Sequence, residues 1–309
     1  MDTFVQQIIN GLTLGSVYAL VALGYTMVYG IIGLINFAHG EVVMIGAMVA
    51  LTTIQALVGA STGLPPSIVI LAGLAVAIPV CMFVGYSAER IAYRPLRKAP
   101  RLAPLITAIG VSIVLQNIAL IVWGRGYKTF PALWKITSYH IGEATITDLQ
   151  VIIIVSAALL MLGLLLLVHK TRLGTAMRAT AQNQAVAGLM GININTVISV
   201  AFLIGSGLAA VAGVMVMTYY GIGHYQMGFL LGLKAFTAAV LGGIGNLAGA
   251  MLGGILLGII ESLGAGYIGD LTGGFLGSNY QDIFAFFVLI AVLTLRPSGL
   301  LGERIGDRA

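Results

Sequence analysis

The sequence is poor in charged residues. Of 309 residues, 15 are Lys or Arg and 10 are Asp or Glu, so 8% are charged, whereas soluble proteins carry about 25%. Because 59% of the residues are hydrophobic, polar side chains could not cover a surface that faces water. The composition therefore excludes a soluble protein and predicts one that lies in a lipid bilayer. Several spans of about 20 residues would use most of the chain, so we expect a single membrane domain over residues 1–309.

Further absences exclude other classes. The one cysteine, Cys81, can form no internal disulfide and so indicates no redox compartment. No Lys or Arg precedes Arg90, whereas a cleaved signal peptide normally begins with basic residues, so the first apolar stretch should remain as a span. The dipeptide Gly-Lys is absent, which excludes the P-loop of an ATPase in this chain. Histidines and serines show no metal-hydrolase or nucleophile pattern, so we expect no enzyme, metal or cofactor here.

What the sequence does contain is a series of long apolar stretches. Solid runs such as residues 151–155 favour helices, because the strands of a membrane barrel alternate apolar and polar residues. The prediction is an all-α, polytopic transmembrane helical bundle of about nine spans, within a range of roughly eight to ten. Seven or eight spans with re-entrant pieces also fit the sequence. The candidate spans are residues 8–33, 41–58, 67–89, 102–123, 149–168, 196–219, 229–243, 247–264 and 281–296.

The basic residues predict which ends face the cytoplasm, where Lys and Arg accumulate in membrane proteins. This rule also explains the net charge of +5 without a nucleic-acid partner. The N-terminus should then lie outside and the C-terminus inside, in a bacterial inner membrane, with the first cluster contacting lipid headgroups. Three clusters carry the argument: Arg90, Arg94, Arg97, Lys98 and Arg101; Lys170, Arg172 and Arg178; and Arg296, Arg304 and Arg308.

Two segments interrupt the apolar pattern. Polar residues break the stretch 30–41, and glycines at 242–245 follow the short span 229–243, which is only about 22 Å long as a helix. Broken helices of this kind line substrate pathways in transporters. The tripeptides at 36–38 and 246–248 also resemble each other, as two repeated halves would.

The polar residues of these segments have two interpretations. They line a substrate pathway, or they bond and cap neighbouring helices, as polar side chains in membranes commonly do. Lys234 should extend to the interface or meet an external group rather than a substrate carboxylate, and Glu89 should pair with the adjacent Arg90 at a span end. The residues assigned to the pathway are Asn36, His39, Glu41, Gln116, Gly243, Gly245 and Asn246.

A transporter without its own ATPase takes energy from an ion gradient or from a partner. Ion-coupled carriers usually bury several ionisable groups, whereas here only Glu41, Glu261 and Lys234 approach membrane depth. This favours a partner. The stretch 169–195 is rich in alanine and small polar residues and has glycines at either end, so it predicts a short helix that protrudes between two spans. The residues assigned to ATPase coupling are Arg172, Gly174, Arg178, Ala181, Gly188, Gly191 and Asn193.

This loop resembles the Arg-x-Gly, Ala-rich, Gly-Ile-Asn loop of the LivH-type permeases of branched-chain amino-acid ABC importers and, more distantly, that of ribose-type sugar permeases. One departure is Gln182-Asn183, where the family commonly has an acidic pair, so any salt bridge from that position to an ATPase would be lost. The resemblance continues in order along the chain at residues 11–20, 25–46, 92–95, 234–249 and 296–302.

The resemblance implies an importer with several subunits. This chain would be the permease, with a second homologous permease, two cytoplasmic ATPase subunits that bind the ATP, and an extracytoplasmic amino-acid-binding protein that delivers branched-chain amino acids. The chain itself would have no catalytic activity. The alternative is a self-sufficient ion-coupled carrier or channel for small neutral solutes.

Overall fold

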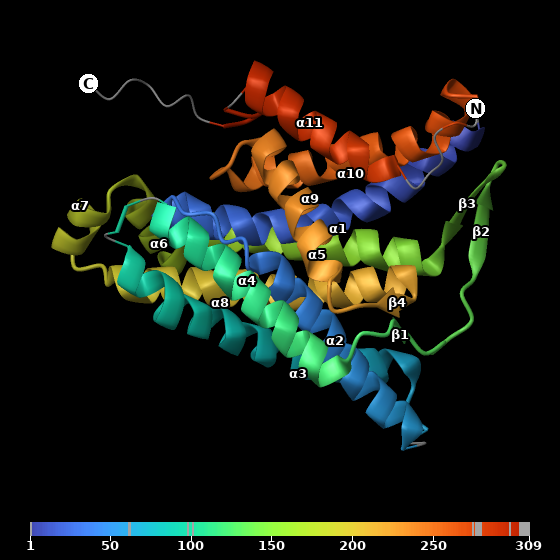
Figure 1. The fold of residues 1–309 in the computed structure, drawn as a ribbon, viewed down its shortest axis with the longest axis horizontal. Helices are drawn as coiled ribbons and strands as arrows, with labels where there is room; N and C mark the ends of the chain where they lie inside the picture. The colour runs from blue at the N-terminus through green and yellow to red at the C-terminus, as the bar shows by residue number, and fades with distance from the viewer. Residues whose placement is uncertain are drawn as a thin grey trace. The chain divides into compact units, whose positions relative to one another are not determined.

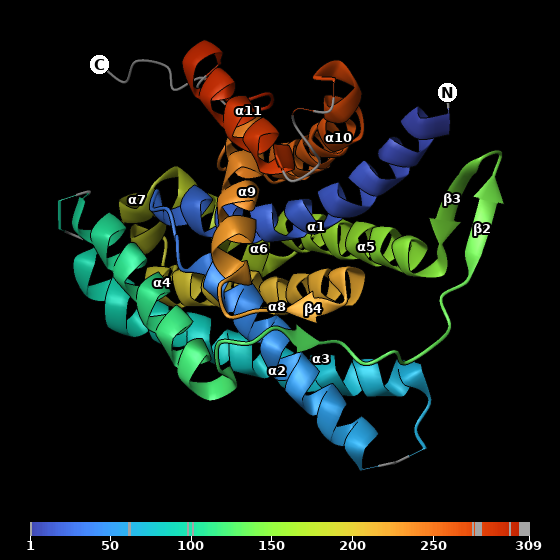
Figure 2. The same ribbon diagram turned by 45° about the vertical axis from the view of Figure 1, so that its right-hand side comes forward.

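The structure is a computed structural model that describes residues 2–60, 63–97, 99–100, 102–273, 275, 280–296 and 298–302, and most of these are helical (Figure 1, Figure 2). Some residues used in the predictions above lie outside the described residues, namely Lys98, Arg101, Pro297, Arg304 and Arg308.

All nine predicted spans correspond to apolar helices. Within the described residues, seven helices are long and apolar enough to cross a membrane. The other two, α9 (Met227–Gly242) and α11 (Gln281–Leu295), have 16 and 15 residues. At about 1.5 Å per residue both are shorter than the ~30 Å hydrocarbon core. The all-α, polytopic fold is therefore confirmed, and the span count roughly fits. The long helices are α1 (Asp2–Ile32), α2 (His39–Gly59), α3 (Pro66–Ser87), α4 (Leu102–Trp123), α5 (Asp148–Lys170), α8 (Ile194–Tyr220) and α10 (Leu247–Leu271).

Local sequence sets several helix ends. Helix α3 begins at Pro66, where a first-turn proline costs no hydrogen bond. Gly221 ends α8 in the left-handed conformation, with φ of +71°. The other end of α3 is unusual, because the chain continues as a π-helix, η1 (Ala88–Tyr93), and then as a 3₁₀ turn, η2 (Arg94–Leu96). A π-helical turn interrupts regular α-helix and is often found at functional sites.

The chain forms two compact units. Unit 1 comprises Met1–Thr26, Ile136–Leu165 and Lys234–Ala309, and unit 2 comprises Met27–Lys135 and Leu166–Leu233. Three of the four boundaries fall within α1, α5 and α9, and the fourth lies between β1 (Lys128–Thr129) and β2 (Ser138–Ile141). The prediction of a single membrane domain stays a prediction.

Glycines let helices pack closely inside each unit. In unit 2, a Cβ at Gly46 of α2 would lie 2.6 Å from the Cα of Ala210 in α8. In unit 1, a Cβ at Gly15 of α1 would lie 2.7 Å from the Cα of Ile255 in α10. Both contacts require a residue without a side chain, as in small-residue helix packing in membranes.

Both predicted breaks are present. Residues 33–38 separate α1 from α2, and residues 243–246 separate α9 from α10. Gly243 and Gly245 have φ of +107° and +99°, a region that other residues rarely enter.

Short strands lie outside the long helices. The segment between α4 and α5 contains β1 (Lys128–Thr129) and the hairpin strands β2 (Ser138–Ile141) and β3 (Ala144–Thr147). Strands β2 and β3 pair in antiparallel register, with Ser138 opposite Thr147. In unit 2, β1 pairs with β4 (Ile222–Gly223), the segment that follows α8.

Candidate translocation and coupling sites

The first polar site surrounds Glu41, in the first turn of α2 in unit 2. Glu41 is 1% exposed, and its Oε1 accepts hydrogen bonds from Gln116 at 2.7 Å and from Ser112 at 3.1 Å, both on α4. Its Oε2 has no hydrogen-bond partner in the described part of the chain. A Cβ built on Gly228 would lie 2.7 Å from this oxygen. Glu41 is therefore bonded by neutral donors at one oxygen, and its other oxygen is buried without a hydrogen-bond partner among the described residues.

Asn36 and His39 are also buried, but they belong to a different set of contacts. The Oδ1 of Asn36 accepts a hydrogen bond of 2.6 Å from the hydroxyl of Tyr93, and its backbone oxygen accepts one of 2.9 Å from the amide of His39. Tyr93 lies in η1, so the break before α2 is tied to the π-helix. Gln116 bonds the neighbouring helix, whereas Asn117 bonds the carbonyl of Ile113 in its own helix.

The second predicted pathway segment, residues 242–246, lies in unit 1, and residues 241–246 form hydrogen bonds with residues 300–301. Backbone amides of Leu300 and Leu301 donate to the carbonyls of Leu241 and Gly242 at 2.8 and 2.9 Å. Asn246 caps α10 by accepting from the amide of Gly249 at 3.0 Å, and its Nδ2 donates to the carbonyl of Leu301 at 2.8 Å. These contacts satisfy the groups that a broken helix would otherwise leave unpaired. Gly243 and Gly245 provide the turn between the two helices.

The prediction for Lys234 was wrong. Its side chain is 8% exposed and forms ion pairs with Glu261 of α10 and, at 2.6 Å, with Asp282 of α11. It also contacts the Tyr18 hydroxyl at 3.3 Å. All of these residues belong to unit 1. The partners of the ammonium are thus two carboxylates on neighbouring helices of the same unit, not an external group.

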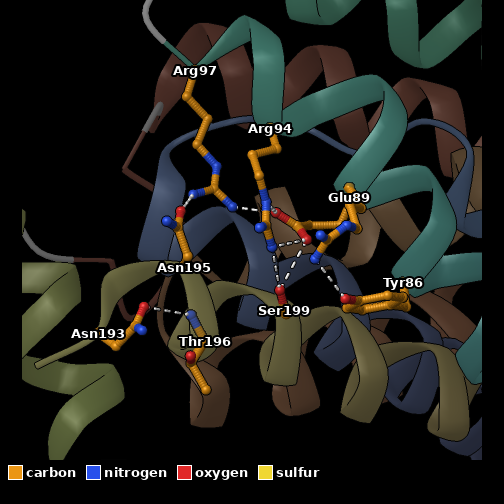
Figure 3. Close-up of polar contacts among 9 residues, drawn as sticks. Tyr86, Glu89, Arg94, Arg97, Asn193, Asn195, Thr196 and Ser199 are labelled. Atoms are coloured by element: carbon orange, nitrogen blue, oxygen red, sulfur yellow. Dashed lines mark hydrogen bonds and ion pairs between the residues drawn. The ribbon is translucent and has the colours of Figure 1, made fainter.

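The predicted pairing of Glu89 with Arg90 was also wrong. Glu89, which is 0% exposed, pairs with Arg94 at 2.9 Å and with Arg97, whereas Arg90 donates to the Tyr86 hydroxyl at 2.9 Å (Figure 3). Partial burial lowers the pKa of the Arg97 guanidinium and the Glu89 carboxylate opposes that shift; an arginine nonetheless stays charged.

The predicted coupling helix is two helices, α6 (Arg172–Gln182) and α7 (Gln184–Leu189), at one end of unit 2 (Figure 1). Asparagine and threonine side chains cap the helix starts: Thr171 accepts from the amide of Gly174 at 3.0 Å, and Asn183 from that of Val186 at 3.1 Å. Asn183 is thus the N-cap of α7, a role that explains an amide at this position. Gln184 donates to the carbonyl of Ile31 at 2.9 Å.

The seven residues assigned to coupling differ in exposure. Gly174 is buried and packs closely against α5, since a Cβ at this position would meet the backbone carbonyls of Leu167 and Val168. Arg178 is exposed and donates to the carbonyl of Val168. Gly191 turns the chain with φ of +85°, and Asn193 caps α8. The other three, Arg172, Ala181 and Gly188, are exposed.

Sequence reasoning missed three parts of these sites. Ser112 was not identified because a single hydroxyl in an apolar helix carries no spacing signal, and Tyr93 was noted only as part of the motif at residues 92–95. Residues 298–302 were noted only as a motif, and their contact with the break at 243–246 joins positions far apart in the chain. Within the described residues no group of three or more His, Cys, Asp or Glu could hold a metal ion.

Comparisons with known proteins place the chain in a family. Residues 7–293 match the family model described as "Branched-chain amino acid transport system / permease component". The chain is 48% identical to the high-affinity branched-chain amino acid transport system permease protein BraD of Pseudomonas aeruginosa, over 97% of this chain and 96% of BraD. It is 46% identical to the corresponding protein LivH of Escherichia coli strain K12, with the same coverage.

Among solved structures, a chain of PsaBC from Streptococcus pneumoniae in complex with Fab aligns with 96% of this chain and 91% of its own length, at 15% identity and a TM-score of 0.47. The assignment depends on the family model and the two curated permeases, whose matches run over nearly the full length of the chain. This multi-pass membrane chain therefore belongs to the branched-chain amino acid permease family, and its role is that of a transport permease, not an enzyme.

Proposed function

We propose that this chain is the permease subunit of an ATP-driven ABC importer for branched-chain amino acids. An extracytoplasmic binding protein delivers the amino acid, two cytoplasmic ATPase subunits bind and hydrolyse ATP, and a second homologous permease completes the pathway. The names of the two curated relatives support the substrate class. The segment α6–α7 is the observation that supports the ATPase partner.

The end of this segment carries exposed apolar side chains. Leu189 is 86% exposed and Met190 is 79% exposed, and Val186 one turn earlier is also exposed. These side chains lie in and directly after the short helix α7, in the segment between α5 and α8, and not on one of the long apolar helices that lipid would surround. An apolar group outside the membrane-spanning helices is a common feature of protein interaction sites. We assign this small exposed apolar surface to contact with an ATPase subunit.

The charges around the segment support a cytoplasmic location. Lys170, Arg172 and Arg178 lie within or beside it, and basic loops stay on the cytoplasmic side. If this end lies inside and all nine apolar helices cross the membrane, the N-terminus lies outside and the C-terminus in the cytoplasm of a bacterial cell.

Two groups of residues are proposed to line the pathway. In unit 2 they are Asn36, His39, Glu41 and Gln116, and in unit 1 they are Gly243, Gly245 and Asn246. The oxygen of Glu41 that has no hydrogen-bond partner among the described residues supports the first group, because a carboxylate can accept a hydrogen bond from an ammonium group. The exposed Gly245 beside a broken helix supports the second.

The ion-coupled carrier remains the competing function, and one observation favours it. Lys234 and Glu261 are buried and form a charge cluster with the partly exposed Asp282, and ionisable groups inside a membrane protein often mark ion pathways. Proteoliposomes separate the two functions. The ATP-driven importer takes up leucine only with ATP inside the vesicle and all subunits present, and an ionophore leaves uptake unchanged, whereas a carrier loses uptake with the ionophore.

The docking surface has its own test. Leu189→Asp combined with Met190→Asp places two charges where an apolar contact is expected, so ATPase association should fall by about tenfold or more. Association is measured by co-purification and titration of the ATPase with the detergent-solubilised permease. The control is Tyr139→Asp, which changes another exposed side chain, in β2. Equal association of the double variant and the wild type would disprove docking at α7. Gly174 is unsuitable for this test, because its substitution would disturb packing against α5.

A further inference from the structure

The π-helix η1 carries two buried polar side chains that point to different parts of unit 2. Glu89 contacts the start of α8 (Figure 3), and Tyr93 contacts the break before α2. Neither residue is part of the pathway or the docking surface described above.

Glu89 is bonded by charged and neutral donors at once. Arg94 donates to both carboxylate oxygens, at 3.1 and 2.9 Å, Arg97 donates to Oε1, and Ser199 donates to Oε2 at 2.9 Å. Such a two-pronged arginine contact fixes orientation as well as adding energy. Ser199 also accepts from Arg94 at 2.8 Å, and Arg97 donates to Asn195 at 2.6 Å. Because Ser199 and Asn195 lie in the first turns of α8, this cluster joins η1 to the start of that helix.

The start of α8 is in turn joined to α7. Only residues 190–193 separate the two helices, and the amides of Gly191 and Ile192 donate back to the carbonyls of Gly188 and Ala187, each at 3.1 Å. Asn193 then caps α8 by accepting from the amide of Thr196 at 3.2 Å. The link between α7 and the first turn of α8 is therefore a hydrogen-bonded turn.

The other end of η1 reaches the break at residues 33–38. The Tyr93 hydroxyl donates to Asn36 at 2.6 Å, and the Tyr93 ring packs against Phe202 of α8 at a centroid distance of 5.5 Å. Asn36 precedes α2, whose first turn holds Glu41. The π-helix thus contacts both α8, which follows α7, and the break at residues 33–38, which precedes α2.

We propose that η1 is a relay for coupling in unit 2, and that Glu89 and Tyr93 are its positioning residues. Displacement of α7 by the ATPase moves the start of α8, the Glu89 cluster moves η1 with it, and Tyr93 passes the displacement to the break before α2. This inference rests on the proposed ATP-driven import. A buried ion cluster often adds little stability compared with apolar packing, so its value here is the fixed orientation it imposes.

The test uses the complete importer in proteoliposomes, with leucine uptake and ATP hydrolysis measured in the same vesicles. Glu89→Gln removes the charge at constant size, and Tyr93→Phe removes only the hydroxyl that reaches Asn36. Both should assemble with the ATPases and hydrolyse ATP, while leucine transported per ATP hydrolysed falls roughly two- to thirtyfold. The matched control is Arg90→Gln. Arg90 lies in the same π-helical turn, but it donates its hydrogen bond to the hydroxyl of Tyr86 in an exposed pair. It should keep the wild-type ratio.

The outcomes are distinguishable. If the wild-type complex shows no ATP-dependent uptake, the proposed function and this inference are both overturned. If the wild type transports and Tyr93→Phe keeps its ratio of leucine to ATP, only the relay is overturned, even where Glu89→Gln fails to assemble. A fall in uptake and hydrolysis in equal proportion would show that the residues merely stabilise the complex and would also overturn the relay.

Discussion

Glu41 and Glu89 are both buried carboxylates of unit 2, but different kinds of donor bind them. Glu89 accepts from two guanidinium groups and a hydroxyl, which satisfy both of its oxygens. Glu41 accepts only from an amide and a hydroxyl, both at Oε1. Among the described residues, no ion pair includes Glu41.

This difference separates two uses of a buried acid in a membrane protein. A carboxylate with charged partners is expensive to leave unpaired, so it holds its neighbours in place. A carboxylate with neutral partners and one unpaired oxygen can accept a hydrogen bond from another donor at that oxygen without breaking an ion pair. The contacts therefore suit Glu89 to positioning and Glu41 to a pathway.

The largest expected effect comes from removing the Glu89 carboxylate. Glu89→Ala leaves Arg94 and Arg97 without their shared counter-charge, and breaking a buried pair in this way costs about 3 kcal/mol. The same substitution at Glu41 strands only neutral donors and should cost about 1–2 kcal/mol. Thermal unfolding of the two purified variants in one detergent measures the difference. Equal shifts of the unfolding midpoint would remove the distinction between the two carboxylates.

The sequence predicted the helices but not the partners of the buried charges. Spans were predictable because solid apolar runs such as Leu149–Val168 have few alternatives, and the breaks because glycine and polar residues rarely occupy a helix interior in lipid. A helical segment between α5 and α8 was predictable from its composition, but the N-cap at Asn183, which divides it into α6 and α7, was not.

The partner of Glu89 was not predictable from α-helical spacing. In an α-helix, side chains three and four residues apart are neighbours, so Arg94, five residues after Glu89, would not be expected to face it. The π-helix closes its turn over five residues and brings the two together. For Lys234, the partners Glu261 and Asp282 lie on two other helices, so only tertiary packing reveals them.

A smaller effect is expected from crowding the open side of Glu41. In Gly228→Ala, the new methyl group would lie 2.5 Å from the carbonyl oxygen of Gly40 and 2.7 Å from the Glu41 Oε2, so the backbone must move. Overpacking of this kind costs about 1–3 kcal/mol. The control is Gly110→Ala in α4, where nothing lies within 4 Å of the added carbon and alanine favours the helix. Thermal unfolding in detergent should therefore show a lower midpoint for Gly228→Ala alone; a normal midpoint would mean that this side of Glu41 is loosely packed.

The smallest effect on stability is expected from Glu41→Gln. Glutamine keeps an acceptor oxygen for Gln116 and Ser112 and changes only the atom that has no partner, so the unfolding free energy should shift by less than about 1 kcal/mol. Uptake should respond differently, because a neutral amide binds an ammonium group more weakly than a carboxylate does. Leucine transport by the reconstituted importer should therefore fall severalfold while leucine transported per ATP stays constant, which separates a pathway residue from a relay residue. Wild-type uptake by Glu41→Gln would show that the open carboxylate oxygen has no part in the pathway.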